Sequence, residues 1–235
     1  MREIIFDTET TGFKPEEGER IIEIGAVEMV NRSFTGRVFH EFLNPEGREV
    51  NPGAFEVHGI SNEFLADKPA FSGIASAFLE FIGEDAILVA HNAPFDINFL
   101  NHEFARLSIP AIDPQRVVDT LVMARKKHPM AQNSLDRLCE RYKIDNSSRT
   151  KHGALLDSEL LAEVYIELLG GRQAAFELEP AARETRAETG REQVTTDRLL
   201  ARPSPLPSRL TEADIEAHRR FVGKLGEDAL WNRYG

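Results

Sequence analysis

Five short stretches of the chain have the apolar pattern of β-strands. Ile4-Ile5-Phe6 is a run rich in β-branched residues, and residues 86–90 form a continuous apolar run, which is typical of a strand buried on both faces. Residues 20–30, 36–43 and 116–119 are the other three. Because the connection over 31–35 is short, we expect the first three strands to form an antiparallel meander.

Helical periodicity appears in the second half of this region. Residues 71–82 carry an apolar stripe with a 3.6-residue repeat, which predicts a helix. Further helices are predicted over 95–107 with Pro94 in the first turn, from the strand 116–119 to about 127, over 134–142 and over 155–169. Residues 51–61 look irregular, although Ser61 is suited to cap a short helix. Strands in a meander, followed by strands alternating with helices, predict an α/β domain with a mixed five-stranded sheet.

The composition changes after Gly170-Gly171. Residues 177–209 are rich in Glu, Arg, Ala, Thr and Pro without an apolar period, which predicts a flexible linker. Beyond it, Thr211 to Asp214 resembles a capping box and opens a short helix with an apolar stripe of Ile215, Val222 and Leu225. We therefore divide the chain into a domain over 1–176, a linker over 177–209 and a C-terminal segment over 210–235.

The bulk properties limit the kind of protein. The N-terminus shows no secretory signal, and no apolar run is long enough to span a membrane, so we expect a cytoplasmic protein without a membrane partner. Cys139 is the only cysteine and is expected to be a small buried residue. The net charge of −11 argues against a freestanding nucleic-acid binder. It remains compatible with an enzyme that grips a strand end through metal ions while a partner holds the substrate.

The first apolar run leads into two carboxylates, Asp7 and Glu9. Side chains alternate across a strand, so both point to the same face. Two neighbouring anions repel each other unless a positive charge lies between them, and a divalent cation with oxygen ligands fits that requirement. The alternative is an exposed strand end with two solvated acids.

Two further candidate groups stand where helices begin. Asp96 falls in the first turn of the helix 95–107, where a carboxylate also complements the helix N-terminus. His152 and Asp157 flank the start of the helix 155–169. Five residues correspond to about 140° around a helix. We therefore expect His152 in the preceding loop, free to move, and Asp157 fixed in the helix.

Together these motifs resemble the Asp-Glu-Asp-Asp family of 3′-5′ exonucleases, in the branch whose last motif has a histidine five residues before the final aspartate. The matching stretches occur in the family order and cover roughly residues 1–170: Asp7-Thr8-Glu9-Thr10-Thr11-Gly12, His91-Asn92-Ala93-Pro94-Phe95-Asp96 and His152-Gly153-Ala154-Leu155-Leu156-Asp157. The sequence around them more narrowly resembles the proofreading epsilon-subunit family of bacterial DNA polymerase III, over residues 118–121, 133–135 and 157–165.

This resemblance implies a ribonuclease-H-like exonuclease fold that removes mispaired nucleotides from a primer 3′ end and releases nucleoside 5′-monophosphates. Two cations, Mg²⁺ or Mn²⁺, about 3.5–4 Å apart would hold the scissile phosphate. Their implied ligands are Asp7, Glu9, Asp96 and Asp157, with Asp7 bridging the two. His152 would take the proton from the attacking water, because imidazole titrates near neutral pH.

The resemblance also implies contacts to the last nucleotide. The matching positions are Asp7, Glu9, Thr10, Thr11, Val57, His58, Asn92, Phe95 and Asp157. For Val57 and Phe95, ordinary core packing is the alternative. Asp119 is interpreted as supporting or structural rather than as a ligand, and His91 as a packed, hydrogen-bonded histidine.

Two partner contacts are implied by the same family. Residues 171–176 would bind a sliding clamp, although Gln173 stands only three residues before Phe176, a tighter spacing than the family motif. The C-terminal segment would bind the alpha-type polymerase subunit, with Trp231 and Tyr234 as aromatic anchors. Such a partner would place the protein at the nucleoid.

Two other functions remain open at the level of sequence. An RNA-trimming exoribonuclease of the same superfamily would carry the same catalytic residues, although compact enzymes of that kind generally lack the linker and aromatic tail. A noncatalytic module that tethers partners would not need all five catalytic positions to be filled. Both features favour the DNA proofreading exonuclease.

Overall fold

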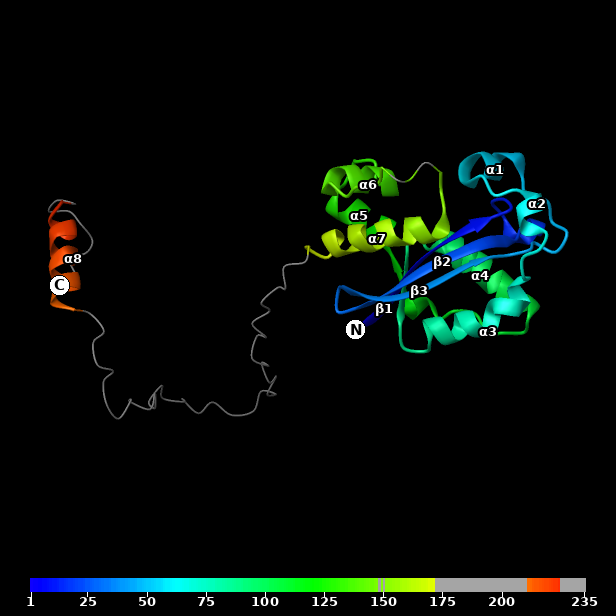
Figure 1. Ribbon diagram of the computed structural model, residues 1–235, viewed down its shortest axis with the longest axis horizontal. Helices are drawn as coiled ribbons and strands as arrows, with labels where there is room; N and C mark the ends of the chain where they lie inside the picture. The colour runs from blue at the N-terminus through cyan, green and yellow to red at the C-terminus, as the bar shows by residue number, and fades with distance from the viewer. Residues whose placement is uncertain (148, 150, 172–210, 225–235) are drawn as a thin grey trace, which may run out of the picture. The chain divides into compact units, whose positions relative to one another are not determined.

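The computed structural model describes residues 1–147, 149, 151–171 and 211–224 (Figure 1). The chain divides into two compact units, Met1–Glu177 and Leu178–Gly235, and each is described by itself. The first unit contains the sheet and all the candidate catalytic residues. The second contains one described helix.

A five-stranded mixed sheet forms the centre of the first unit. Its strands lie in the order β3-β2-β1-β4-β5, with bounds β1 Arg2–Thr10, β2 Ile21–Val30, β3 Ser33–Phe42, β4 Ile87–Ala90 and β5 Val117–Asp119. β2 pairs antiparallel with both β1 and β3. β4 pairs parallel with β1 and β5. This arrangement confirms the predicted meander and the mixed sheet, and it puts β1 in the middle.

The hairpin between β2 and β3 is tighter than predicted. β3 begins at Ser33, three residues before the expected start, because Asn31 and Arg32 alone make the turn. Both residues take positive φ, 51° and 65°, as a two-residue turn of the primed type requires. Asparagine tolerates this conformation well, and it was the one available signal for the shorter turn.

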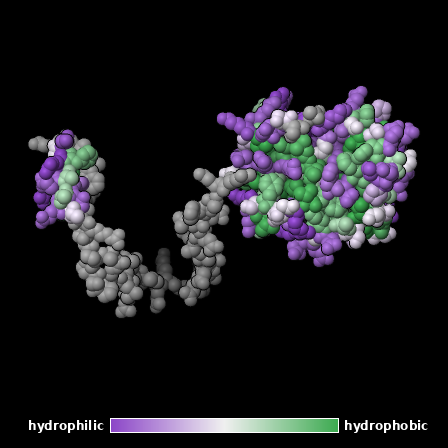
Figure 2. Space-filling view, viewed as in Figure 1, coloured by the Kyte–Doolittle hydropathy of each residue, from purple (hydrophilic) through white to green (hydrophobic). Residues whose placement is uncertain are grey.

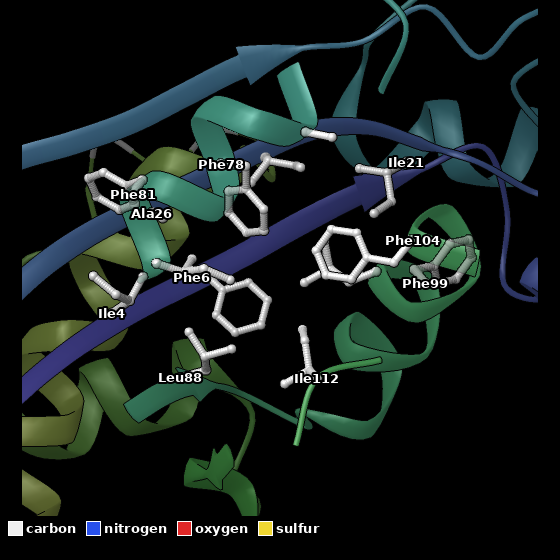
Figure 3. Packing of buried hydrophobic residues seen from close by; sticks show 14 of the residues in the cluster. Ile4, Phe6, Ile21, Ala26, Phe78, Phe81, Leu88, Phe99, Phe104 and Ile112 are labelled. Atoms are coloured by element: carbon white, nitrogen blue, oxygen red, sulfur yellow. The ribbon is translucent and has the colours of Figure 1, made fainter. Parts of the chain in front are cut away.

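Helices cover the sheet on both faces and create two separate cores. α3 (Phe71–Ile82) and α4 (Pro94–Arg106) pack on one face; α5 (Thr120–Lys127), α6 (Leu135–Tyr142) and α7 (Ala154–Leu168) pack on the other (Figure 1). Alternate β1 residues face the two cores: Ile4 and Phe6 contact the first, and Ile5 contacts the second. Figure 3 shows Phe6 beside Phe78, with Phe99 and Phe104 further along the same layer. The sheet and flanking helices confirm the predicted fold class.

The segment 51–61 was expected to be irregular, and that prediction was wrong. It contains α1 (Pro52–His58), whose start is capped by the Asn51 side chain, which accepts a hydrogen bond from the Gly53 amide at 3.0 Å. Gly59 ends the helix with φ of 74°. An asparagine cap, a first-turn proline and a terminal glycine are all helix signals, but the seven-residue helix is too short to show periodicity.

Short elements complete the first unit. Ser61 caps α2 (Asn62–Leu65) as predicted, because its hydroxyl accepts a hydrogen bond from the Phe64 amide at 3.2 Å. Single 3₁₀ turns, η1 (Pro15–Glu17) and η2 (Pro114–Arg116), follow β1 and precede β5. Cys139 is fully buried in the second core, as expected.

In the second unit the structure describes helix α8 (Glu212–Lys224). The predicted capping box is formed: the Thr211 hydroxyl accepts from the Asp214 amide at 3.2 Å, and the Thr211 amide donates to the Asp214 carboxylate at 2.9 Å. Ile215 and Phe221 are exposed apolar side chains on this helix, and Figure 2 shows hydrophobic and hydrophilic atoms on different sides of it. Leu225, Trp231, Tyr234 and residues 172–176 lie outside the described part of the chain.

None of the helices in the described ranges is long and apolar enough to cross a membrane.

The N-terminal turn of α7 lies directly on β2, and Gly25 makes this contact possible. The Ser158 hydroxyl in that turn donates to the Gly25 carbonyl at 2.8 Å. A Cβ added at Gly25 would lie 2.1 Å from the Leu155 nitrogen and 2.2 Å from the Ala154 carbonyl carbon, both backbone atoms that cannot move without moving the helix. The close approach therefore fixes where Asp157, one turn into α7, sits above the sheet.

We expect Gly25→Ala to displace the first turn of α7. Overpacking of this kind lowers the free energy of unfolding by roughly 1–3 kcal/mol, and the exonuclease activity that the resemblance implies should fall as Asp157 moves. Denaturant unfolding and nucleotide release would measure the two effects. Gly73→Ala in α3 is the matched control, because its Cβ would meet only Pro69 at 3.5 Å. Wild-type stability and activity in Gly25→Ala would refute this account of the contact.

Candidate active site

Asp7 and Glu9 project from β1 on the side covered by α7. They share the orientation of Ile5, which packs in the core beneath α5, α6 and α7, since strand side chains alternate. The pairing of β1 with β2 shifts register between Glu9 and Thr10, so the strand is irregular just beyond the second carboxylate. The prediction that both acids lie on one face is confirmed.

Asp96 approaches the same strand from α4. Its carboxylate accepts two hydrogen bonds from Thr8, one from the amide at 3.1 Å and one from the hydroxyl at 2.7 Å. Asp96 is buried, so these bonds offset part of the cost of burying a charge. Asp96 therefore does more than complement the helix N-terminus: it ties the start of α4 to the C-terminal part of β1.

His152 and Asp157 lie as the sequence predicted, one in a loop and one in a helix. Asp157 is in the first turn of α7 and is buried. His152 precedes the helix, with a half-exposed side chain, and its Nδ1 lies 3.5 Å from Asp157 Oδ2. The His152 amide donates to the Val57 carbonyl at 3.3 Å, which anchors the loop on α1.

One cleft of about 300 Å³ brings these groups together. Its lining includes seven of the predicted site residues: Asp7, Glu9, Asn92, Phe95, Asp96, His152 and Asp157. Thr8, His91, Ser134, Leu135, Asp136 and Arg149 complete the lining. Thr10, Val57 and His58, which were predicted to contact the nucleotide, are not among the lining residues.

Arg149 and Asp136 are cleft residues that sequence reasoning missed. Arg149 makes a two-pronged ion pair with Asp157, through Nε at 2.5 Å and Nη2 at 2.7 Å, and its Nη1 donates to Asp136 at 2.6 Å. Neither residue stands out in the sequence. The only available signal was that Arg149 lies three residues before His152, so that a loop returning to the site carries both.

The predicted contacts outside the cleft have different environments. Val57 is exposed on α1, whereas His58 is buried, and its Nδ1 accepts from the Ile60 amide at 2.9 Å. Thr10 is buried, and its hydroxyl donates to the Gly12 carbonyl at 2.6 Å. Phe95 is partly buried and packs on Phe99 with ring centroids 5.0 Å apart, while it also lines the cleft.

His91 and Asp119 support the turn that leads into α4. His91 Nδ1 lies 2.9 Å from the Thr120 hydroxyl, as expected for a packed, hydrogen-bonded histidine. Asp119 accepts from the amides of Leu121 at 2.8 Å and Asn92 at 3.1 Å. Asn92 has φ of 64°, and this contact holds it there. Asp119 therefore has a structural role in the described chain, in line with the prediction.

Burial is the main reason that the pKa values of three cleft acids, Asp7, Glu9 and Asp96, are raised. Burial, and then the charges of Asp96, Glu9 and Asp157, hold the pKa of Asp7 well above its usual value. Burial and the neighbouring Glu23 raise the pKa of Glu9 to about 8. Burial raises the pKa of Asp96 to about 7, although its hydrogen bonds with Thr8 oppose the shift. The cleft thus has an excess of negative charge.

These residues fit a divalent cation. The four carboxylates offer oxygen atoms, which Mg²⁺ and Mn²⁺ prefer, and ligand atoms of Glu9, His152 and Asp157 lie within 4.8 Å of one another. Arg149 is the only cation that lines the cleft among the described residues, so it offsets a single negative charge. A bound cation would relieve the repulsion that remains.

Comparison with known proteins agrees with this geometry. The family model for exonucleases of the RNase T type matches residues 4–165. DNA polymerase III subunit epsilon of Rickettsia felis is 48% identical over 229 residues, covering 96% of this chain and 97% of the relative. The Escherichia coli K12 subunit epsilon is 47% identical over 242 residues, covering 98% and 97%.

The chain belongs to the DNA polymerase III subunit epsilon family. It is a 3′-5′ exonuclease of the proofreading kind, which confirms the resemblance drawn from its motifs. Exonucleases of this superfamily depend on divalent metal ions.

Solved structures of exonucleases have the same fold as this epsilon-family chain. Exonuclease X in complex with 5′ overhanging duplex DNA is 26% identical with a TM-score of 0.56, covering 72% of this epsilon-family chain and 90% of that one. The nuclease domain of 3′hExo, described as a DEDDh family member bound to rAMP, has a TM-score of 0.60 at 20% identity, covering 72% and 91%. The second likeness shows the fold alone.

The raised pKa of Glu9 predicts how pH changes stability when cations are removed. An acid whose folded pKa is about 8, against 4.5 ordinarily, binds its proton more tightly in the folded state. Its ionisation therefore lowers the free energy of unfolding as pH rises from about 4.5 to 8. In EDTA, Glu9→Gln should raise the melting temperature at pH 8 and change it little at pH 5.

Glu80→Gln is the matched control for this experiment, because Glu80 is an exposed carboxylate on α3. It should leave the melting temperature unchanged at both pH values. A Glu9→Gln variant that melts below the wild type at pH 8 would show that Glu9 is not strained by its neighbours.

Proposed function

We propose that this epsilon-family protein removes mispaired nucleotides from a DNA primer 3′ end with the five residues Asp7, Glu9, Asp96, His152 and Asp157. The observation that carries the proposal is their convergence in one cleft from β1, α4, α7 and the loop before α7. The family membership supplies the reaction type, and the cleft supplies a complete set of groups for it.

In this proposal, the four carboxylates would hold two divalent cations, Mg²⁺ or Mn²⁺, and Asp7 would be the ligand that both could share. Its central place is supported by the charges of Glu9, Asp96 and Asp157, all of which act on it. Such cations make a water easier to deprotonate and stabilise the departing 3′ oxygen. Thr8 fixes Asp96 through two hydrogen bonds, and Gly25 lets α7 carry Asp157 close to the sheet.

His152 takes the proton from the attacking water. A general base needs a pKa near or below the working pH and a free lone pair. Burial, together with the nearby Arg149 charge, lowers the pKa of His152, so its imidazole is neutral at physiological pH. Its loop position allows the ring to approach the water, while Asp157 stays fixed.

The last nucleotide lies between the loop after β1 and the start of α4. Asn92 and Phe95 line the cleft and contact the sugar and base, respectively. Val57 is exposed on α1, and its carbonyl accepts the hydrogen bond from the His152 amide. Its side chain is available to pack against the nucleobase. Binding of the nucleotide also depends on the backbone segments that Thr10, Thr11 and His58 hold in place.

In this proposal, the chain beyond the exonuclease domain binds partner proteins. Residues 1–176 form the exonuclease domain, 177–209 link it, and 210–235 bind the alpha-type polymerase subunit through Trp231 and Tyr234. The full-length match to named epsilon subunits and the exposed apolar residues of α8 support this assignment. Residues 171–176 are a candidate clamp-binding segment. A polymerase partner would hold the protein in the cytoplasm at the nucleoid.

We predict that the purified protein releases nucleoside 5′-monophosphates faster from a mismatched primer–template than from a matched one or from short RNA, and only with a divalent cation. Asp7→Ala should abolish release, because it removes the shared ligand. His152→Gln should lower kcat about 10²–10⁴-fold, the usual contribution of a general base. Chromatographic analysis of the released mononucleotides would measure these effects.

His102→Gln is the control for the histidine change, since His102 bonds within α4 to the Asn98 carbonyl and lies outside the cleft. It should retain wild-type release. Faster trimming of RNA than of DNA would favour the exoribonuclease alternative. Full activity in Asp7→Ala would refute the site, and absence of activity in the wild type would favour a noncatalytic tether.

A truncation tests the partner segment. A protein ending at residue 209 should lose co-purification with a large polymerase subunit and keep its activity on free DNA, because all five catalytic residues lie in the first unit. Pull-down from cells that express both proteins, alongside the nucleotide assay, would measure the two properties. Loss of activity on free DNA would show that the tail belongs to the catalytic fold.

A further inference from the structure

Arg149 engages two of the groups that the reaction needs. Its Nε and Nη2 donate to Oδ1 and Oδ2 of Asp157, so both oxygens of this carboxylate are engaged. The same Nη2 lies 2.9 Å from Nδ1 and 3.3 Å from Nε2 of His152. A third group, Nη1, donates to Asp136 at 2.6 Å. One guanidinium therefore connects a proposed cation ligand, the proposed base and a residue at the rim of the cleft.

These contacts conflict with the roles of their partners. A carboxylate that coordinates a cation must direct lone pairs at it, and a guanidinium on both oxygens competes for them. A histidine that accepts a proton needs a free lone pair, and Nη2 of Arg149 lies within hydrogen-bonding distance of both ring nitrogens of His152. The positive charge of Arg149 also repels a divalent cation nearby. Arg149 and the cations therefore exclude each other, at least in part.

We propose that Arg149 is a positioning residue that clasps Asp157 and His152 until divalent cations bind, and that its release frees His152 to act as the base. This proposal rests on the cation ligands and base assigned above. In this proposal, cation binding frees His152 to act as the base. The water is therefore deprotonated only when the cations that stabilise the reaction are bound.

Asp136 gives the released guanidinium a second place to bind. It lies in the first turn of α6 with half of its side chain exposed, on the solvent side of the cleft lining. Arg149 can therefore rotate away from Asp157 and keep one ion pair, so that its charge is never left unpaired. In sequence, Arg149 stands between the end of α6 at Tyr142 and the start of α7 at Ala154.

A purely structural role explains the contacts less well. Burying an ion pair costs desolvation energy, and the attraction between the two charges often only balances that cost. This pair is nevertheless buried: the Arg149 side chain is 7% exposed and that of Asp157 is 3% exposed. In the described chain, every hydrogen-bond partner of the Arg149 side chain lines the cleft. A residue that only held the loop would not need to engage the base.

Cation affinity tests the clasp without requiring turnover. We expect Arg149→Gln to bind Mn²⁺ about tenfold more tightly than the wild type, equivalent to about 1.4 kcal/mol, because a competing charge is gone. Arg149→Lys keeps the charge but cannot form the fork, so its Kd should fall between the two. Titration calorimetry with Mn²⁺ alone would measure all three.

Arg106→Gln is the matched control, because Arg106 is exposed at the end of α4 and outside the cleft. It removes the same charge from the chain and should bind Mn²⁺ as the wild type does. Unchanged or weaker binding by Arg149→Gln would overturn the clasp.

A measurement on the wild type covers the case in which Arg149→Gln does not fold. In ¹⁵N-arginine-labelled protein, the Arg149 Nε–H signal, identified by its loss in Arg149→Lys, reports the bond to Asp157. Saturating Ca²⁺ should move this signal and speed its exchange with water. A signal that does not respond to Ca²⁺ would also overturn the proposal.

Asp157→Asn separates this inference from the proposed function. If Asp157→Asn leaves Mn²⁺ binding intact, the ligand assignment itself is wrong, and the clasp falls with it. If Asp157→Asn removes Mn²⁺ binding while Arg149→Gln binds Mn²⁺ as the wild type does, the ligand assignment is retained and only the clasp is overturned.

Discussion

The mutual repulsion of four carboxylates beside β1 is the constraint on which the rest of the structure depends. These four carboxylates would separate if each were free to move, since burial and like charge both disfavour the ionised forms of Asp7 and Glu9. They stay together because three different elements hold them. The free energy that keeps them close comes from apolar packing elsewhere in the domain, and a cation can recover part of it on binding.

The two hydrophobic cores divide that task. The core under α3 and α4 fixes Asp96 against β1, and the core under α5, α6 and α7 fixes Asp157. β1 lies between them and contributes residues to both, so its own carboxylates are placed relative to each core at once. A shift of either layer would change the separation of the ligands. This arrangement explains why a glycine on β2, where α7 touches the sheet, matters for a site that it does not line.

Within the site, positive charge is scarce and therefore informative. Among the described lining residues only Arg149 is cationic, and it pairs with Asp136 and with Asp157, which lies beside His152. The same guanidinium that offsets charge in the cleft thus also contacts both Asp157 and His152. The net charge of −11 has a related consequence, because a chain this acidic holds a polyanion poorly by itself. An exonuclease of this kind gains from a partner that binds the DNA.

The sequence by itself determined the sheet and most of the helices, and it predicted five residues that the structure brings to one cleft. Each of these has a local signal: alternation, a 3.6-residue stripe, or a carboxylate at the point where an element begins or ends. It also placed His152 in a loop and Asp157 in a helix from their spacing alone. It failed for α1, which is too short for periodicity, and for the two-residue turn at Asn31 and Arg32.

Only the tertiary structure decided how the elements meet. The ion pair of Arg149 with Asp157 joins a loop to a helix turn, and the role of Gly25 depends on the distance between α7 and β2. Likewise, the cleft includes Asn92 and Phe95 but leaves Thr10, Val57 and His58 outside its lining. Periodicity and spacing describe which way a side chain points along its own element. They carry no information on which side chain from another element it meets, because packing of the two cores sets that distance.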